Sequence, residues 1–574
     1  MLGISASKTK RILAYAKPHL GLMALVFLVM IVATALGLVN PYLMKILIDD
    51  VLVAGNLRLF AYVLGAYIVV MVIAIGVTIA LSYYSTLLTE RIALDVRRQL
   101  FNHIESMSLG FFKERKTGDI VSRLMTDVYG VQSYITTFMN GIVLNIITLV
   151  IIFAITMSIN WQITLISLYI VPFYIWAEKY YGNLMRKQRR KLREQSADML
   201  GFLEENINFV KLVKRFHREE YAEADFKRRA EKMLKLDVKA SLTGGLASSF
   251  IALVTFLPLL VILGIGGYQV IKGMLTIGGM IAIYTYIGKL FEPIDSLNSS
   301  VMSLQGALAS VDRVFEFLDK KEKIVDAPDS VAVKSLKGEI EFKKVSFKFK
   351  DKVILDNASF RIKPGEQAYL IGASGSGKST IGDLIFRFYD PDKGQVLIDG
   401  MDVKKIKIGS LRERLGIGSQ ELILFNTTIA DNIRFGKTHA KMEEVKAAAK
   451  TAQAADFIEK MPEGYETVVG PGGGLLSGGQ KQRISLSRTI LHNPDIYILD
   501  EVTTGLDPES EKKIESALRE VTKGKTTVYI THKLRSAKGA KRILFLRDGK
   551  IVEDGSFDAL LKKKGDFYKF YKEG

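Results

Sequence analysis

Residues 372–379 have the types and spacing that suit phosphate chemistry. They read GASGSGKS, and they follow the apolar stretch Tyr369-Leu370-Ile371. Glycines let backbone N–H groups converge on a phosphate, and the N-terminus of a following helix adds a favourable dipole. The residues after the loop have helical periodicity, so the order is strand, glycine loop, helix. This order predicts a phosphate-binding loop.

The same loop offers side chains as well as backbone groups. We expect Lys378 to reach the β- and γ-phosphates of a nucleotide and Ser379 to coordinate Mg²⁺. By itself, the pattern predicts nucleotide binding without identifying a family. The loop residues predicted to bind the nucleotide are Gly372, Ser374, Gly375, Gly377, Lys378, Ser379 and Thr380.

A second segment could supply the carboxylates of a hydrolytic site. The apolar residues 496–499 predict a buried parallel strand that ends in Asp500, and Glu501 follows at once. A carboxylate at such a strand end can hold Mg²⁺, so Asp500 is a predicted metal ligand. Glu501 would act as the general base for the attacking water, or would orient it.

Between these two motifs lies another glycine-rich segment, LSGGQ at residues 476–480. It resembles the signature of the ATP-binding-cassette (ABC) ATPases. Residues 338–574 resemble a complete ABC cassette with its elements in family order. The resemblance implies ATP and Mg²⁺ as the ligands of this half of the chain.

The resemblance also implies roles for residues outside these motifs. Phe349 matches the aromatic residue that stacks on adenine, where the family usually has Tyr. Gln420 matches the lid-loop glutamine that senses Mg²⁺, and His532 matches the switch histidine that contacts the γ-phosphate. Asp507 ends a D-loop, residues 504–507, that reads TGLD where exporters more often read SALD.

The signature segment raises the question of assembly. Ser477 and the backbone of Gly478 and Gly479 lie at the start of a predicted helix, where they are free to bind an anion. In the family this segment closes over the ATP of a partner cassette, and Gln480 is its last residue. The chain is therefore expected to work as a dimer. Its intact motifs favour a homodimer, and the departures at Thr504-Gly505 and Pro471 leave open the competent half of a heterodimer.

The first half of the chain has a different composition. The 574 residues are 48% hydrophobic and 24% charged, with a net charge of +19. Much of the basic excess lies in loops between apolar segments, which favours a membrane protein over a nucleic-acid-binding one. A bilayer span needs about 20 apolar residues. Six segments qualify: 20–47, 58–84, 138–159, 161–182, 244–272 and 274–298.

Charge predicts the orientation of these spans. The loops between spans two and three and between spans four and five are basic, which places them and both termini in the cytoplasm. These loops, 85–137 and 183–243, predict helices that extend far beyond the bilayer. Polar residues also occur within the spans, and a packing or interfacial role is the favoured interpretation for each: Lys45, Asn140, Asn145, Lys289, Glu292 and Asp295.

The predicted architecture has three parts. Residues 1–319 form an all-α transmembrane domain with six spans, residues 320–337 a linker, and residues 338–574 an α/β P-loop ATPase domain. The six-span half is similar to bacterial half-transporters of the exporter type, and residues 112–119 and 211–222 resemble their coupling helices. Exporters usually read Val-Gly-Glu-x-Gly before the signature, whereas this chain has Pro471 in place of the glutamate.

We expect an ATP hydrolase of the bacterial cell membrane that exports an amphipathic drug, lipid or peptide by alternating access. The partners would be a second half-transporter and membrane lipid, with no nucleic acid. An importer built on the same fold, for example for metallophores, is the alternative. A regulatory membrane protein is disfavoured by Glu501. The chain has no cysteine, which excludes disulfides, Cys–zinc sites and thiol catalysis.

Overall fold

The computed structural model describes residues 11–12, 14–321, 324–418, 422–502, 508–532 and 534–573. It divides into two compact units. The first unit contains Met1–Ile104 and Gly118–Asp319, and the second contains Glu105–Thr117 and Lys320–Gly574. The sequence predicts residues 1–319 as one domain, but the short segment Glu105–Thr117 packs with the second unit.

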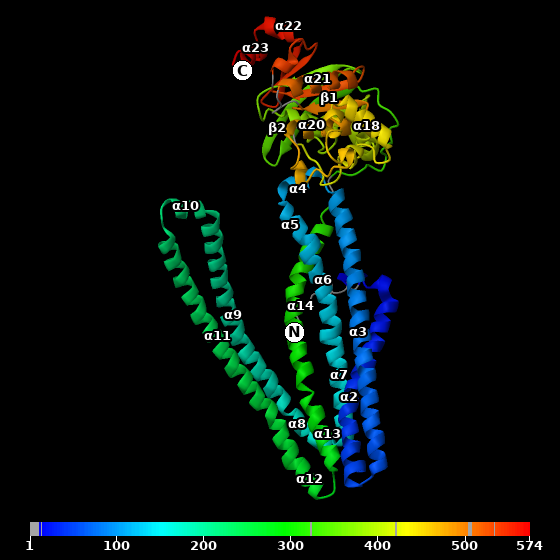
Figure 1. Cartoon of the computed structure of the whole chain (residues 1–574), viewed down its shortest axis with the longest axis vertical. Coiled ribbons are helices and arrows are strands. Elements are labelled where there is room, and N and C mark those ends of the chain that lie inside the picture. The colour runs from blue at the N-terminus through cyan, green and yellow to red at the C-terminus, as the bar shows by residue number, and fades with distance from the viewer. Residues whose placement is uncertain are drawn as a thin grey trace. The chain divides into compact units, whose positions relative to one another are not determined.

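All the regular elements in the described part of the first unit are helices (Figure 1). The helices α9 and α11 run side by side, and the short helix α10 joins them. Four π-helical segments interrupt the longer helices: η2 (Leu47–Val53), η3 (Arg123–Asp127), η4 (Thr137–Val143) and η5 (Ile262–Gly266). The α-helices are α2 (Leu20–Ile46), α3 (Leu57–Ser106), α5 (Thr117–Ser122), α6 (Val128–Thr136), α7 (Leu144–Ile159), α8 (Trp161–Leu168), α9 (Ile170–Asn208), α10 (Val210–Arg215), α11 (Glu219–Val261), α12 (Gly267–Ile271), α13 (Ile277–Gly288) and α14 (Phe291–Leu318).

Four of the six predicted spans lie in continuous helical segments. Among the described residues, four segments are long and apolar enough to cross a membrane. The helical extensions predicted for residues 183–243 are also present: α9 and α11 continue well beyond the apolar residues of their spans. The four segments are Lys17–Val53, Leu57–Glu105, Thr117–Ile159 and Glu219–Ile271.

The other two predicted spans are each divided between two helices. Segment 161–182 is interrupted at Tyr169, between α8 and α9, shortly before Pro172. Segment 274–298 is interrupted between α13 and α14, shortly before Pro293. Proline offers no N–H to the carbonyl four residues earlier, and its ring crowds that turn. Each proline therefore stands in the first turn of a new helix, where no N–H is needed.

A third proline explains how α2 and α13 are joined. Pro41 lies inside α2 and leaves the carbonyl of Gly37 without its helical donor. The Lys289 Nζ atom donates to that carbonyl at 2.9 Å, and the Tyr286 hydroxyl donates to the next one, Leu38, at 2.6 Å. A backbone carbonyl in a membrane must find an internal partner, so these contacts stabilise the pair of helices. They give Lys289 a packing role.

The N-terminus of α13 is also satisfied, by the π-helical segment η2 that continues α2. The Gly278 N–H donates to a carboxylate oxygen of Asp49 at 2.7 Å. A Cβ atom at Gly278 would lie 2.6 Å from the carbonyl oxygen of Lys45, so only glycine permits this approach. Groups at both ends of α13 therefore donate hydrogen bonds to α2 and to its continuation η2.

Replacing Tyr286 by Phe is expected to lower the free energy of unfolding by about 1–3 kcal/mol, the cost of a buried acceptor that loses its donor. Tyr286 is 1% exposed. Thermal unfolding in detergent measures the effect. Tyr284→Phe is the matched control, because that side chain on the same helix is 45% exposed. Equal midpoints for both variants would contradict this role of the hydroxyl.

The second unit contains two sheets. One has six strands in the order β10-β9-β3-β8-β7-β6, mostly parallel, and the other has four antiparallel strands in the order β2-β1-β4-β5. The strands are β1 (Ile340–Phe349), β2 (Lys352–Ile362), β3 (Gln367–Ile371), β4 (Lys393–Ile398), β5 (Met401–Asp402), β6 (Leu415–Gly418), β7 (Ile496–Asp500), β8 (Thr526–Thr531), β9 (Ile543–Arg547) and β10 (Lys550–Gly555). The helices are α4 (Leu109–Glu114), α15 (Lys378–Ile385), α16 (Ile408–Arg412), α17 (Ile429–Arg434), α18 (Met442–Thr451), α19 (Ala455–Ile458), α20 (Gly478–His492), α21 (Pro508–Val521), α22 (Phe557–Lys563) and α23 (Asp566–Glu573).

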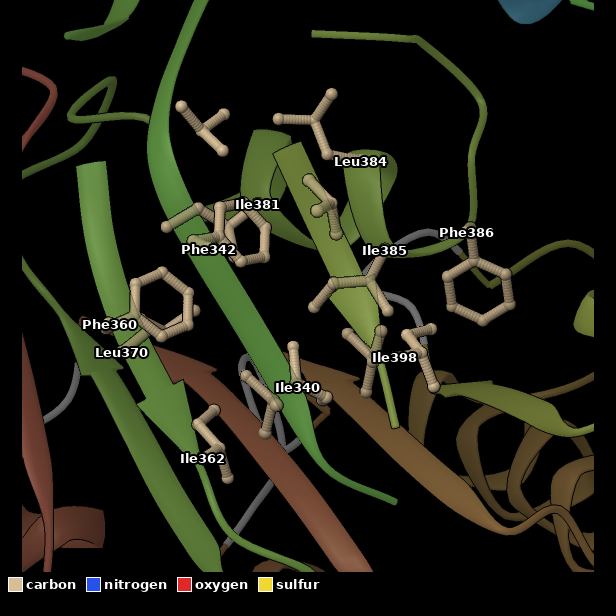
Figure 2. Close-up of a cluster of buried hydrophobic side chains, with 14 of the residues drawn as sticks. Ile340, Phe342, Phe360, Ile362, Leu370, Ile381, Leu384, Ile385, Phe386 and Ile398 are labelled. Atoms are coloured by element: carbon tan, nitrogen blue, oxygen red, sulfur yellow. The ribbon is translucent and has the colours of Figure 1, made fainter. Parts of the chain in front are cut away.

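The core of this unit fixes the helix that follows the glycine loop. Ile381 and Ile385 of α15 are fully buried in a cluster with strand residues of both sheets (Figure 2). In the same cluster the rings of Phe342 and Phe360 stack with their centroids 4.5 Å apart. A separate core holds α17, α18 and the signature helix α20 together. The glycine loop and the signature segment therefore lead into two helices, α15 and α20, that pack in different cores.

Candidate functional site

Sheet topology brings three predicted motifs to one edge. Strand β8 pairs in parallel with β3 on one side and with β7 on the other. The register aligns Ile371 with Thr531 and Asp500 with Ile530. The residues that follow these strand ends are the glycine loop, His532 and Glu501. Ligands bind at the carboxyl edge of parallel sheets, so this edge is the candidate site.

The glycine loop needs its glycines. Gly375 and Gly377 have φ angles of +79° and +104°, in the left-handed region that favours glycine. A Cβ atom at Gly377 would lie 2.9 Å from the carbonyl oxygen of Ile354. Ser376 is buried, and its hydroxyl oxygen has no hydrogen-bond partner among the described residues. A loop whose glycines have left-handed φ angles, with a buried hydroxyl that has no partner, fits a phosphate group.

Lys378 points back into this loop. Its side chain is buried, and the Nζ atom donates to the carbonyls of Gly372 and Ala373, both at 2.9 Å. Burial lowers the pKa of Lys378, and the nearby Glu501 and Asp500 carboxylates oppose that shift. The ammonium is thus held at the loop, where a phosphate could take over its hydrogen bonds.

Asp500 and Ser379 form the candidate metal site. Burial raises the pKa of the Asp500 carboxyl, while a hydrogen bond with the Ser379 side chain lowers it. A carboxylate and a hydroxyl are oxygen ligands of the kind that Mg²⁺ prefers. Thr380, the next residue, is half-buried at the start of α15.

Glu501 and His532 contact each other directly. The Glu501 Oε1 atom lies 2.6 Å from the Nδ1 atom of His532. Glu501 has a φ of +50°, a rare conformation for a residue with a side chain, and its N–H donates to the carbonyl of Ile530 at 2.9 Å. Backbone strain of this kind concentrates at functional sites. Sequence reasoning named both residues but not this contact.

Phe349 lies at the end of β1 and is half-buried. Its ring packs edge-to-face against Tyr389, with the centroids 6.2 Å apart. Stacking on adenine stays a prediction for Phe349. Gln420, the D-loop 504–507 and its Asp507 lie outside the described residues.

The signature segment caps a helix. Ser477 is the N-cap of α20: its hydroxyl accepts from the Gln480 N–H at 3.3 Å, and its own N–H donates to the Gln480 side chain at 2.9 Å. Ser477 and Gly478 are exposed, and Gly479 is half-buried. The capping role of Gln480 was missed at the level of sequence, although a serine followed three residues later by glutamine signals it. The exposed N-terminus of a helix suits an anion.

The first expected coupling segment contacts the glycine-loop helix within the second unit. The Lys113 Nζ atom of α4 lies 3.7 Å from a carboxylate oxygen of Asp383 on α15, and 5.4 Å from the centre of the Tyr389 ring. Burial raises the pKa of Asp383, and the Lys113 charge opposes the shift. Nothing in the sequence pattern predicted this pair. The segment expected as the second coupling helix, residues 211–222, overlaps α10 and the start of α11.

Pro471 opens a short 3₁₀ turn, Pro471–Gly473, and is exposed just before the signature. Gly472 and Gly473 in this turn have positive φ angles of +58° and +73°. The turn therefore depends on its glycines, and the proline ring fixes the φ angle of its first residue.

Comparison with known proteins identifies the family. Residues 23–294 match the family described as "ABC transporter transmembrane region", and residues 355–504 match the family "ABC transporter". The chain is 34% identical to an ATP-dependent lipid A-core flippase of Syntrophus aciditrophicus, over 98% of this chain and 94% of that protein. It is also 34% identical to the putative multidrug export ATP-binding/permease protein YgaD of Bacillus subtilis, over 97% of this chain and 98% of that protein.

A solved structure has the same architecture. It is described as a bacterial Atm1-family ABC exporter with ATP bound, and it matches with a TM-score of 0.77 at 29% identity, covering 96% of this chain and 98% of that one. The predicted fold class is thereby confirmed: a helical transmembrane region followed by an α/β ABC ATPase. The chain belongs to the ABC transporter family, as an exporter-type transmembrane region joined to an ABC ATPase in one polypeptide.

Proposed function

We propose that this chain is one half of a bacterial exporter that uses ATP hydrolysis to move an amphipathic substrate across the cell membrane. The observation that carries the proposal is the meeting of the glycine loop, Asp500-Glu501 and His532 at one sheet edge. The same chain supplies helices long enough to span a bilayer. Export is favoured over import because the relatives are described as a flippase and a multidrug exporter.

The residues at this edge have separate roles in binding the phosphates, holding the metal ion and activating the attacking water. Lys378 and the N–H groups of the glycine loop bind the phosphates, while Asp500 and Ser379 hold Mg²⁺. When bound, Mg²⁺ neutralises charge that develops on the phosphate oxygens. Glu501 accepts the proton of the attacking water or orients that water, and His532 positions the Glu501 carboxylate.

The exposed signature supports assembly as a dimer. Ser477 and Gly478 offer a helix N-terminus to solvent, on a helix packed in a different core from the glycine loop. We propose that each signature closes over the ATP of the other chain. Two identical chains would give two complete sites, so a homodimer is favoured over a heterodimer. Both termini and the ATPase unit would lie in the cytoplasm.

Cysteines introduced at Ser374 and Ser477 are expected to cross-link between chains when ATP is present. The chain has no cysteine of its own. If one tagged chain carries Ser374→Cys and another carries Ser477→Cys, no cross-link within a chain can form. Oxidation should give a product of twice the 64.0 kDa of one chain, visible on a non-reducing gel.

Ser359→Cys in place of Ser477→Cys is the control for random collision, because Ser359 is exposed on β2. It should give little product with or without ATP. Preparations that hydrolyse ATP yet form no ATP-dependent product from the Ser374 and Ser477 pair would refute the shared site.

A further inference from the structure

A small cavity lies between α21 and the six-stranded sheet. Its volume is about 70 Å³. Tyr369 of β3, Tyr529 of β8 and Leu499 of β7 are aligned in register, so they form one row across the sheet. All three line the cavity, and Leu518 of α21 lines it from above. The rings of Tyr369 and Tyr529 stack with their centroids 4.6 Å apart, which gives the cavity a mostly aromatic floor.

This floor is on the other face of the sheet from the glycine-loop helix. Successive side chains of a strand point to opposite faces. Leu370 and Ile498 lie in the core that contains Ile381 of α15. Their neighbours along the strands point away from that core, and Leu499 lies in a separate core with Leu518. The cavity is therefore distinct from the phosphate loop.

The cavity nevertheless reaches the catalytic edge. Glu501 and Thr531 both line it, and Thr531 directly precedes His532. The contact of Glu501 with His532 uses the Oε1 atom of the carboxylate, so Oε2 is the oxygen that a molecule in the cavity could engage. Each of the three strands that lead into the glycine loop, Glu501 and His532 contributes a residue to the wall. An occupant would therefore act directly on the proposed general base.

The charge of the lining favours a cation. Glu515 of α21 brings a second carboxylate to the cavity. The Arg519 Nη2 atom lies 4.0 Å from the Glu515 Oε2 atom, and the Arg519 side chain is 80% exposed. An ion pair with so exposed a partner contributes little and opens readily. Among the described residues that line the cavity, two carboxylates thus stand against one arginine.

We propose that this cavity binds the guanidinium group of a small molecule, and that its occupation slows ATP hydrolysis without displacing ATP. The proposal rests on the proposed function. A guanidinium is planar, stacks on aromatic rings and donates paired N–H groups to carboxylates. Because one water takes up about 30 Å³, the cavity would otherwise hold about two waters. The bound cation would pair with Glu501 and Glu515, and it would compete with the attacking water for the Glu501 carboxylate.

The test compares methylguanidinium with methylurea, which is similar in size and equally planar but uncharged. Binding to the full chain in detergent is measured without ATP by isothermal titration calorimetry. We expect methylguanidinium to bind at least about tenfold more tightly, since hydrogen bonds between ionised partners are the strong ones. It should also slow phosphate release, with an inhibition constant that stays within about twofold when saturating ATP is raised tenfold. Tetramethylammonium, a cation without N–H groups, should not inhibit.

Variants of α21 test the position of the site without altering the residues proposed for hydrolysis. Glu515→Gln should weaken methylguanidinium binding by about tenfold, because it removes one of the two charged acceptors. Glu520→Gln, at an exposed glutamate of the same helix, should stay within about twofold of the wild type. Arg519→Gln should bind methylguanidinium more tightly, because it removes the competing cation. Thermal midpoints show that each variant is folded.

Three results would overturn the proposal. They are equal binding of methylurea and methylguanidinium, an unchanged affinity in folded Glu515→Gln, and inhibition that added ATP relieves, which would place the cation among the phosphate contacts. Hydrolysis by the wild type is measured separately. Active hydrolysis without binding of the cation overturns only the cavity site. Binding that depends on Glu515 in a protein without hydrolysis supports the site and overturns the proposed function.

Discussion

Replacing Glu501 by Gln is expected to slow ATP hydrolysis by at least about 10²-fold, the contribution typical of a positioned general base. The amide keeps the size of the side chain but cannot accept the proton of the attacking water. ATP should still bind, because Lys378 and the glycine loop are unchanged. Phosphate release gives the rate of hydrolysis, and a fluorescent ATP analogue gives the affinity.

Glu413→Gln is the matched control for this variant. Glu413 is an exposed glutamate of the same unit, and the same change there should leave hydrolysis within about twofold, as for most surface substitutions. A Glu501→Gln protein that hydrolyses ATP at the wild-type rate would remove Glu501 from the mechanism. It would also leave the contact with His532 without a catalytic purpose.

Most of the candidate site could be predicted because its signals are local in the sequence. A glycine loop directly after an apolar strand occupies residues 369–379, and two carboxylates at the end of another strand occupy residues 496–501, so each signal lies within a short stretch of sequence. Parallel strands then bring such ends to one edge whatever the length of chain between them. The order of the motifs along the chain was therefore enough to predict that Lys378, Asp500 and Glu501 lie at one edge of a sheet. No knowledge of side-chain packing was needed.

The features that were missed depend on partners distant in the sequence. Lys113 and Asp383, or Asp49 and Gly278, contact each other through packing that no local periodicity describes. The interrupted spans were missed for a different reason. Hydropathy averages over about 20 residues and does not register the single N–H that a proline removes.

Replacing Lys378 by Ala is expected to weaken ATP binding and to slow hydrolysis. The substitution removes the buried ammonium that would neutralise the β- and γ-phosphates, and it leaves the carbonyls of Gly372 and Ala373 without their donor. A lost charge-assisted contact costs about 1.5–3 kcal/mol, or roughly 10- to 10²-fold in affinity. Hydrolysis should fall by at least about 10²-fold, since the same charge stabilises the transition state.

The two variants separate binding from chemistry. Glu501→Gln and Lys378→Ala should lose similar amounts of hydrolysis, but only the lysine variant should lose ATP affinity. Lys363→Ala, at an exposed lysine of the same unit, is the control and should retain both activities. If Lys378→Ala bound ATP like the wild type, the phosphates could not lie in this loop. The proposed division of roles between the loop and the Glu501 carboxylate would then be wrong.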